Sequence, residues 1–170
     1  MIYKKLGTSS IRVSALGIGT NGIGNFQNNS PEKTRNRQKI YRFALESGVN
    51  VFDTAELYGE GYAEYILGNT FKKKRDQIIV STKVTPDNCT HISLKRSLKE
   101  SLKRLQTDYV DLLQIHWINP FIKLDETFGA LEELVLGGYA KAIGVCNFSV
   151  PMFQSANKCL KKVKLSSNHI

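Results

Sequence analysis

The sequence predicts an α/β fold in which parallel strands alternate with helices. Six apolar runs are nearly continuous rather than alternating, which is typical of strands that are covered on both faces. Segments with helical spacing lie between these runs, and the strand–helix unit repeats about every 30 residues. We therefore expect parallel strands joined by right-handed crossovers. A doubly wound open sheet and a (β/α) barrel both produce this pattern, and periodicity alone does not separate them.

The elements follow one another in a regular order. Residues 2–7 and 11–16 flank a Thr-Ser-Ser segment and predict a hairpin ahead of the main series. The main strands are expected at residues 13–19, 49–53, 77–83, 109–116, 140–147 and 162–169. Helices are expected at residues 30–48, 61–75, 91–106, 124–138 and 149–162. The first helix should begin with Ser30 as N-cap and Pro31 at its first position, and it should end at Gly48.

The length of the chain bounds the domain count. A chain of 170 residues suits one domain, with the hairpin in residues 1–15 and the βα units in residues 16–170. A (β/α)₈ barrel usually takes about 250 residues, and the sixth apolar run ends at the last residues. If the fold is a barrel, we expect it to be truncated after about six strands. Its first and last strands would then be open edges that favour self-association.

The charge and the cysteines narrow the class of protein. The net charge is +9, but the basic residues interleave with apolar positions at helical spacing, as they do on solvated helix faces. No nucleic-acid-binding motif accompanies them, so we expect no nucleic-acid partner. Three widely spaced cysteines favour a reducing compartment over a disulfide framework. No stretch reaches the roughly 18 apolar residues of a membrane span, so we expect a cytoplasmic protein without a membrane partner.

One glycine motif invites a Rossmann interpretation. Residues 17–22, Gly-Ile-Gly-Thr-Asn-Gly, match G-x-G-x-x-G and follow a predicted strand. However, a polar loop follows the third glycine, whereas the dinucleotide fingerprint requires a helix that starts there. Asp53 ends the next strand about 30 residues later, beyond the usual distance of about 20 residues for a ribose contact. We therefore interpret the motif as a tight loop.

Polar residues end the predicted strands. Asp53, Lys83, His116, Asn147 and His169 close the second to sixth runs in turn. Each has an ordinary explanation alone, such as an Asp that caps a turn. In a closed parallel barrel, however, all these ends face one rim, where the active site is built. Residues far apart in the sequence would then converge.

Tyr58 follows Asp53 by five residues and completes a proton-transfer group. Lys83 ends an apolar strand and needs a counter-charge there, which Asp53 can supply. A cation beside a phenol favours the phenolate, which makes the hydroxyl a better acid. His116 would orient a substrate oxygen or help to pass the proton. General acid catalysis of this kind is typically worth about 10² to 10⁴ in rate and suits a carbonyl that receives a hydride.

At this point the sequence resembles the aldo-keto reductase family. The motifs that carry the resemblance are LGTSSIRVSALGIGT, GVNVFDTAELYGEGYAEYILG, IIVSTKV, SLKRLQTDYVDLLQIHW and GYAKAIGVCNFS. The resemblance implies a TIM barrel with a hairpin that plugs its N-terminal end. It also implies that Asp53, Tyr58, Lys83 and His116 are the catalytic tetrad, with Tyr58 as the acid in carbonyl reduction.

The same resemblance implies an NADP(H) cofactor and a small aldehyde or ketone substrate. The residues expected to contact the cofactor are Gly19, Thr20, Asp53, Cys146, Asn147 and His169. Two of them depart from the family. Cys146 stands where the family usually has Ser, and a thiol is the weaker hydrogen bonder. His169 stands where Gln is common, and an imidazole would add pH sensitivity.

Alternative functions remain open from the sequence. The chain could be a catalytically inactive truncated fragment, or a regulatory relative similar to the potassium-channel beta subunits. A metal-dependent hydrolase is a third class, but the histidines show no H-x-H or H-E-x-x-H spacing. We therefore expect no metal site.

Overall fold

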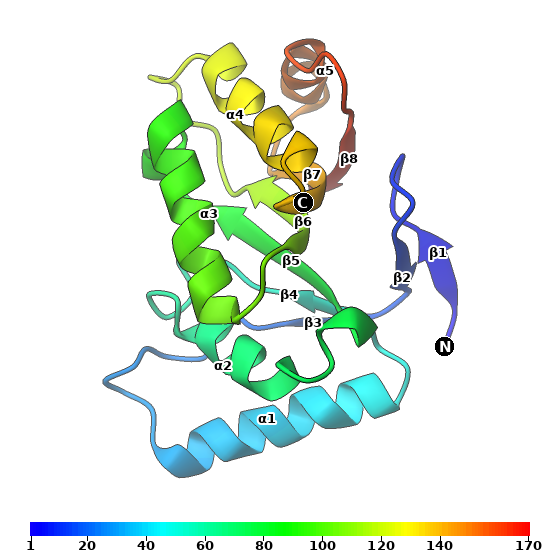
Figure 1. Cartoon of the computed structure of the whole chain (residues 1–170), viewed down its shortest axis with the longest axis vertical. Coiled ribbons are helices and arrows are strands. Elements are labelled where there is room, and N and C mark those ends of the chain that lie inside the picture. Colours follow the sequence, from blue (N-terminus) through cyan, green and yellow to red (C-terminus); the bar gives the residue numbers. More distant parts are fainter.

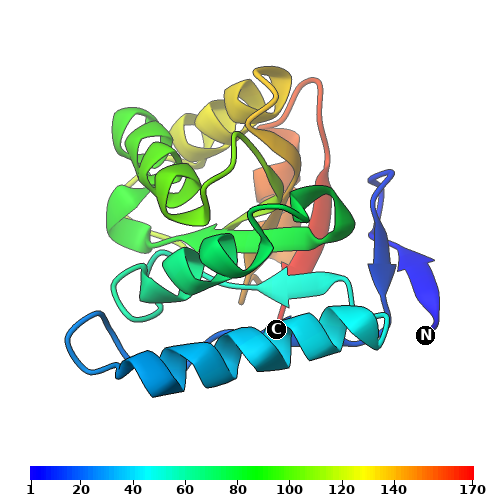
Figure 2. The same cartoon turned by 60° about the horizontal axis from the view of Figure 1, so that its bottom comes forward.

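The computed structural model describes all 170 residues, and its largest feature is a six-stranded parallel sheet (Figure 1). The strands lie in the order β3-β4-β5-β6-β7-β8, which is their order along the chain. A doubly wound sheet would reverse its strand order at a switch point, and this sheet does not. The sheet curls and the helices cover its outer side (Figure 2). The fold is therefore part of a (β/α) barrel with an N-terminal antiparallel hairpin, as predicted.

The elements alternate regularly after the hairpin. The hairpin consists of β1 (Tyr3–Lys5) and β2 (Arg12–Ser14). The sheet contains β3 (Gly17–Gly19), β4 (Val51–Asp53), β5 (Ile79–Val84), β6 (Val110–Ile115), β7 (Ala140–Cys146) and β8 (Leu165–His169). The α-helices are α1 (Pro31–Glu46), α2 (Tyr62–Phe71), α3 (His91–Leu105), α4 (Leu124–Leu136) and α5 (Val150–Lys158). Two short 3₁₀ helices, η1 (Arg75–Gln77) and η2 (Pro86–Asn88), precede β5 and α3.

The predicted elements are present, but some bounds differ. The run at residues 13–19 is divided between β2 and β3, because the Asn50 side chain accepts a hydrogen bond from the Ser14 amide and donates one to the Arg12 carbonyl. The last predicted helix ends at Lys158 rather than 162, because the Glu132 carboxylate binds the backbone amides of residues 161–163. Tertiary hydrogen bonds thus set these bounds.

The start of α1 agrees with the prediction. Ser30 is the N-cap, and its hydroxyl accepts a hydrogen bond from the Lys33 amide at 3.2 Å. Pro31 occupies the first helical position, where its missing N–H costs nothing. Thr90 and Ser149 cap α3 and α5 in the same way. These caps set where the outer helices begin.

The two faces of the sheet differ because side chains alternate along each strand. The outward residues, including Phe52, Leu113 and Ile143, are fully buried against the helices. On the inner face, Leu112 and Ala142 form a small apolar cluster with Ile11 of the hairpin. Gly7, with φ +50°, lies against β8, where a Cβ would meet the Ser166 carbonyl oxygen at 2.0 Å. The hairpin therefore covers the end of the sheet where the strands begin and leaves the opposite rim free.

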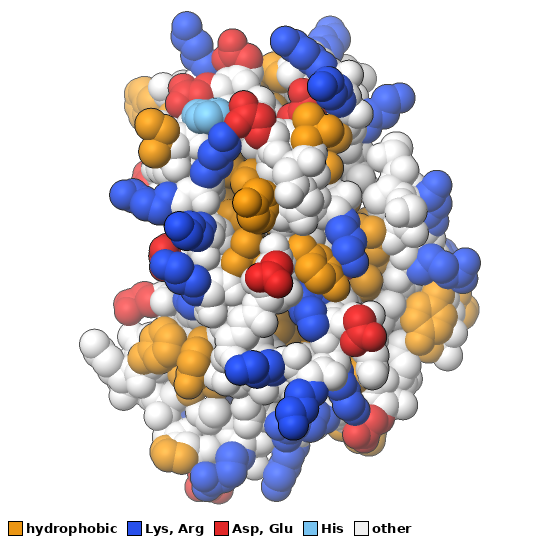
Figure 3. Space-filling model, viewed as in Figure 1, with side chains coloured by type: hydrophobic (Ala, Val, Ile, Leu, Met, Phe, Trp, Pro, Cys, Tyr) orange, Lys and Arg blue, Asp and Glu red, His pale blue; other side chains and the backbone are white.

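The surface carries dispersed charge. Figure 3 shows Lys and Arg side chains scattered over one face, with acidic and apolar side chains between them. None of the helices has the length and apolar character required to cross a membrane.

Candidate active site

The carboxyl ends of the strands bring four of the predicted residues together. Asp53 ends β4, Lys83 lies near the end of β5, and His116 follows β6. The parallel pairing places Asp53 opposite Ser81, two residues before Lys83 on the same face of β5, and it places Lys83 opposite Gln114. Tyr58 comes from the loop between β4 and α2.

Lys83 is the centre of this group. Its side chain is only 2% exposed, and its ammonium group donates to Asp53 Oδ2 at 2.6 Å. The ammonium also lies 2.9 Å from the Thr54 carbonyl oxygen and 3.3 Å from the Tyr58 hydroxyl oxygen. An ammonium has three donors, and each has one of these acceptors. This full set of partners stabilises a buried cation that would otherwise be costly.

The proton of the Tyr58 hydroxyl is not used in a hydrogen bond within the chain. Its oxygen accepts a hydrogen bond from Lys83, and no acceptor in the chain lies within hydrogen-bonding distance of its O–H. The Lys83 ammonium lies 4.9 Å from the centre of the Tyr58 ring, and the ring meets His116 edge to face at 5.7 Å. Tyr58 is partly exposed, so its O–H is within reach of a ligand at the rim.

His116 is a neutral hydrogen-bonding group at neutral pH. Burial, together with the nearby Lys83 cation, lowers its pKa to about 4. The imidazole stacks on Trp117 with ring centres 3.7 Å apart, and its Nδ1 is buried without a partner. Of the two roles expected from the sequence, a neutral imidazole favours orienting a substrate oxygen over passing a proton.

Asp53 is held by a polar chain that the sequence analysis missed. Its Oδ1 lies 3.2 Å from the Ser81 hydroxyl, which is 2.7 Å from Gln114 Oε1. Gln114 in turn lies 3.4 Å from the Ser167 hydroxyl on β8. Ser81, Gln114 and Ser167 each lie two positions before a predicted site residue, so strand periodicity was the signal that could have found them.

The six predicted cofactor-contacting residues all lie at this rim. Gly19 and Thr20 end β3, and the Thr20 amide donates to the Asp53 carbonyl oxygen at 2.9 Å. Cys146 is buried at the end of β7, and burial raises its pKa to about 11. Asn147 has φ +61° and is exposed, and its amide group donates to the His116 carbonyl oxygen at 3.3 Å.

His169 ends β8, the strand at the opposite edge of the curled sheet from β3, and approaches Asp53. Its side chain is 53% exposed, and its Nδ1 lies 4.0 Å from Asp53 Oδ1. This contact is an ion pair only when the imidazole is protonated.

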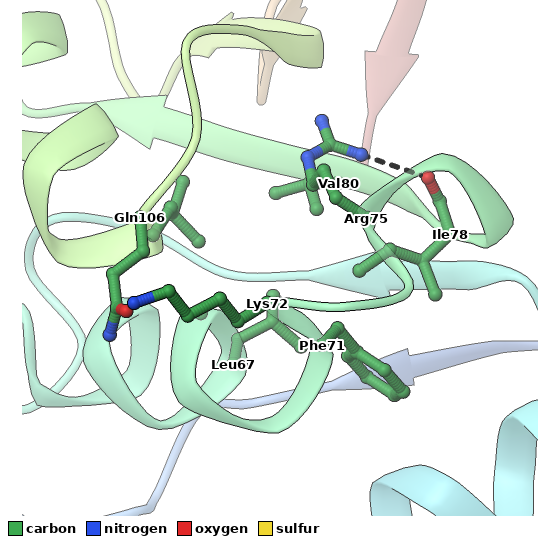
Figure 4. Close-up of a pocket in the computed structure, with 9 residues that line it drawn as sticks. Leu67, Phe71, Lys72, Arg75, Ile78, Val80 and Gln106 are labelled. Atoms are coloured by element: carbon green, nitrogen blue, oxygen red, sulfur yellow. Dashed lines mark hydrogen bonds between the residues drawn. The ribbon is translucent and has the colours of Figure 1, made fainter.

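Two hollows differ in whether they suit a ligand. A hollow of about 270 Å³ follows the inner face of the sheet, and its lining includes Asp53, Ser81, Gln114 and His169. Figure 4 shows a second hollow on the outer side, where Leu67, Phe71 and Gln106 surround a space of about 10 Å³. That volume holds about one water molecule. The inner hollow extends from Leu6 and Val13 of the hairpin to Asp53 and His169 at the rim, so it meets the candidate site at these last two residues.

The fold and the site together define a class of protein. The structure is a (β/α)-barrel scaffold whose strand ends hold a buried Lys–Asp pair against a tyrosine hydroxyl. The aldo/keto reductase family model matches residues 15–170. The chain belongs to the aldo/keto reductase family, as the sequence motifs predicted.

Relatives and solved structures agree with this assignment. The aldo-keto reductase YhdN of Bacillus subtilis (strain 168) is 37% identical over 160 residues, which cover 88% of this chain and 48% of that protein. The thermostable aldo-keto reductase Tm1743, solved with the inhibitor epalrestat, superimposes with a TM-score of 0.91 at 37% identity and covers 99% of this chain and 61% of that one. An aldo-keto reductase from Klebsiella pneumoniae, solved with NADPH, has a TM-score of 0.81 at 32% identity over 91% of this chain and 53% of that one. The chain spans about half the length of the curated relatives that it matches.

The rim has groups that fit a polar cofactor. Thr20, Thr54 and His116 each keep a buried polar atom without a partner inside the chain. The space beside Gly19 is open, since a Cβ there would meet no atom within 4 Å. The exposed side chains of Asn147 and His169 add hydrogen-bonding groups at the ends of β7 and β8. The residues present are therefore compatible with a nicotinamide cofactor.

Proposed function

We propose that this chain forms the catalytic part of an NADPH-dependent reductase that converts aldehydes or ketones to alcohols, with Tyr58 as the general acid. The observation that carries the proposal is the geometry around Lys83. The ammonium is paired with Asp53 and donates to the oxygen of Tyr58, so the Tyr58 proton is left for a substrate. An isolated binding protein would not need a buried cation against a free phenol.

A bound reduced nicotinamide would supply the hydride, and residues of this chain would hold the nicotinamide at the rim. Gly19 leaves room for close approach, and Thr20 lies beside it at the end of β3. Cys146, Asn147 and His169 would face the nicotinamide from β7 and β8. Asp53 belongs both to the proposed catalytic residues and to the proposed cofactor-contacting residues, because its carboxylate lies between Lys83 and His169.

The four tetrad residues divide the proton chemistry. As the carbonyl carbon is reduced, its oxygen gains negative charge, and Tyr58 donates its proton to that oxygen. The Lys83 cation stabilises the phenolate that remains, and Asp53 keeps the cation in place. The neutral His116 imidazole orients the substrate oxygen by a hydrogen bond.

The substrate class, the compartment and the association state belong to the same proposal. One relative, the methylglyoxal reductase DkgB of Salmonella typhimurium, is 35% identical over 132 residues and is named for a small carbonyl compound. The three cysteines are free, which suits the reducing cytoplasm.

Residues 1–170 would act as one barrel domain. Its edge strands β3 and β8 each pair on one side only and would support self-association.

The test uses a chimera with a complete barrel. This chain replaces the matching part of Tm1743, and the reduction of methylglyoxal by NADPH is followed by the loss of NADPH absorbance. We expect Tyr58→Phe to lower kcat by about 10² to 10⁴, while NADPH affinity measured by fluorescence stays within about two-fold. The loss follows from removing the only proton donor that is poised at the substrate.

The control is Tyr65→Phe, which removes a hydroxyl from the outer helix α2 and should leave kcat unchanged. Turnover retained by the Tyr58→Phe chimera would remove Tyr58 from the assigned role. An inactive wild-type chimera that still binds NADPH would favour a regulatory relative.

A further inference from the structure

A carboxylate outside the tetrad binds two separate segments near the site. Glu56 lies in the loop between β4 and α2, two residues before Tyr58. Its Oε1 accepts hydrogen bonds from the Thr85 amide at 2.7 Å, the Thr85 hydroxyl at 2.8 Å and the Asn88 side-chain amide at 3.1 Å. Its Oε2 accepts a bond from the Ser97 hydroxyl on α3. One side chain thus joins the Tyr58 loop to the segment after β5 and to α3.

These hydrogen bonds are made to an ionised group. Burial, the largest single influence, raises the pKa of Glu56, but the hydrogen bonds from Ser97, Thr85 and Asn88 outweigh it and hold the pKa below its ordinary value. Hydrogen bonds to a charged acceptor are about twice as strong as neutral ones. The carboxylate is therefore a strong tie between the three segments at neutral pH.

The Glu56 carboxylate constrains the loop close to Tyr58. The Glu56 amide donates to the Lys83 carbonyl oxygen at 3.3 Å, and the Tyr58 amide donates to Ala55 at 3.1 Å. Gly59, with φ +59°, packs against the Gly24 carbonyl, where a Cβ would lie at 1.8 Å. The loop is thus held on both sides of Tyr58, by the carboxylate before it and by close packing after it.

The contact that this loop supports tolerates little movement. The Lys83 ammonium lies 3.3 Å from the Tyr58 oxygen, and a separation of about 3.6 Å is no longer a hydrogen bond. A shift of a few tenths of an ångström in the loop would break the contact. The backbone before Tyr58 is bound to Lys83 at two points, the Thr54 carbonyl oxygen and the Glu56 amide, and the Glu56 carboxylate adds its side-chain hydrogen bonds to these.

We propose that Glu56 is a positioning residue that holds the Tyr58 hydroxyl against the Lys83 ammonium by binding the loop to Thr85, Asn88 and Ser97. Glu56 does not itself touch the reacting atoms. The catalytic consequence rests on the function proposed above, whereas the positioning of Tyr58 does not. The two are therefore tested separately.

The positioning test is made on the 170-residue chain by NMR, with tyrosine labelled with ¹³C at the ring carbon that bears the oxygen. Tyr58→Phe identifies the Tyr58 signal among those of the seven tyrosines. Lys83→Met should move that signal, because it removes the neighbouring cation. We expect Glu56→Ala to move it as well, and to abolish its response to Lys83→Met in the double variant. Glu56→Gln keeps an acceptor for Thr85 and Asn88, and should preserve the wild-type signal.

A matched control separates this role from general loosening of the fold. Glu132 is also a glutamate that binds a loop, through the backbone amides of residues 161–163 between α5 and β8. Glu132→Ala should leave the Tyr58 signal and its response to Lys83→Met unchanged. If Glu56→Ala does not fold, Ser97→Ala and Asn88→Ala each remove one donor and should move the Tyr58 signal in the same direction by a smaller amount.

The proposal would be overturned if the Tyr58 signal stays in place in Glu56→Ala and still responds to Lys83→Met. The same result in both single-donor variants would also overturn it. In the active chimera, Glu56→Ala should lower kcat about 10- to 100-fold with little change in the KM for NADPH, and Glu56→Gln should restore most of it. A chimera without activity would count against the proposed function, while the NMR result would still decide the role of Glu56.

Discussion

Lys83 illustrates how far a single residue can be interpreted from its neighbours in the sequence. A lysine that ends an apolar strand requires a counter-charge, and Asp53 on the adjacent strand was the expected partner. The structure places the two 2.6 Å apart, with the lysine almost fully buried. The third acceptor, the Thr54 carbonyl oxygen, was not expected, because a backbone contact between strand ends leaves no mark on residue identity.

At the residue scale, His116 predicts a dependence of stability on pH. Its pKa is lowered from 6.5 to about 4, chiefly by burial. Between these values the unfolded chain binds a proton that the folded chain does not, so the free energy of unfolding should fall as the pH falls from 6.5 to about 4. Urea unfolding measured across this pH range should show that the free energy of unfolding falls less in His116→Gln than in the wild type.

The exposed His91 is the matched control for this experiment. Its ring lies beside Glu133 at the surface, so His91→Gln should leave the pH dependence of stability in the same range closer to that of the wild type. Equal pH profiles for the wild type and His116→Gln would mean that the His116 imidazole titrates normally in the folded chain.

At the element scale, a buried ion network joins β6 to its neighbours. Asp111, only 1% exposed, binds Arg75 at 2.7 Å and Lys141 at 2.9 Å, and it also accepts a hydrogen bond from the Val80 amide. Both cations also lie against the Tyr109 ring, each 4.2 Å from its centre. This network connects η1 to β5, β6 and β7.

Asp111→Asn should destabilise the fold without changing the site. The substitution keeps the shape but leaves the Arg75 cation without its counter-charge, and breaking a buried pair typically costs about 3 to 5 kcal/mol. Because Arg75 is 14% exposed and Lys141 is half exposed, we expect the lower end, about 3 kcal/mol, in the free energy of unfolding measured with urea.

Glu100→Gln is the control at this scale, because it removes an exposed pair with Lys103. Exposed pairs contribute little to stability because solvent screens them, so the urea midpoint should move little. A similar change in both variants would show that Asp111 acts as a surface charge.

At the scale of the whole molecule, the two ends of the curled sheet are unpaired on one side. β3 pairs only with β4, and β8 pairs only with β7. The hairpin turn partly covers the start of β8, where the Thr8 hydroxyl lies 3.4 Å from the Leu165 carbonyl oxygen. The later part of β8, which leads to His169, lacks this cover.

These edges predict concentration-dependent association of the 170-residue chain. Unpaired backbone groups on an edge strand favour pairing with a second chain. Sedimentation velocity over a range of concentrations should show the average mass rising above that of the monomer. A mass that stays monomeric at every concentration would contradict the prediction. The chimera with a complete barrel is the control and should remain monomeric under the same conditions.

The sequence by itself determined the order of strands and helices, and it predicted which residues would converge at the strand ends. Hydrophobic periodicity depends on local geometry, and the residues at the strand ends stood out against apolar runs. Only the tertiary structure decided that the sheet curls in chain order, that Glu56 ties the Tyr58 loop to α3, and that Asp111 and the Ser81–Gln114 chain have partners. These features depend on contacts between residues far apart in the chain, and such contacts become definite only when the strands are in register.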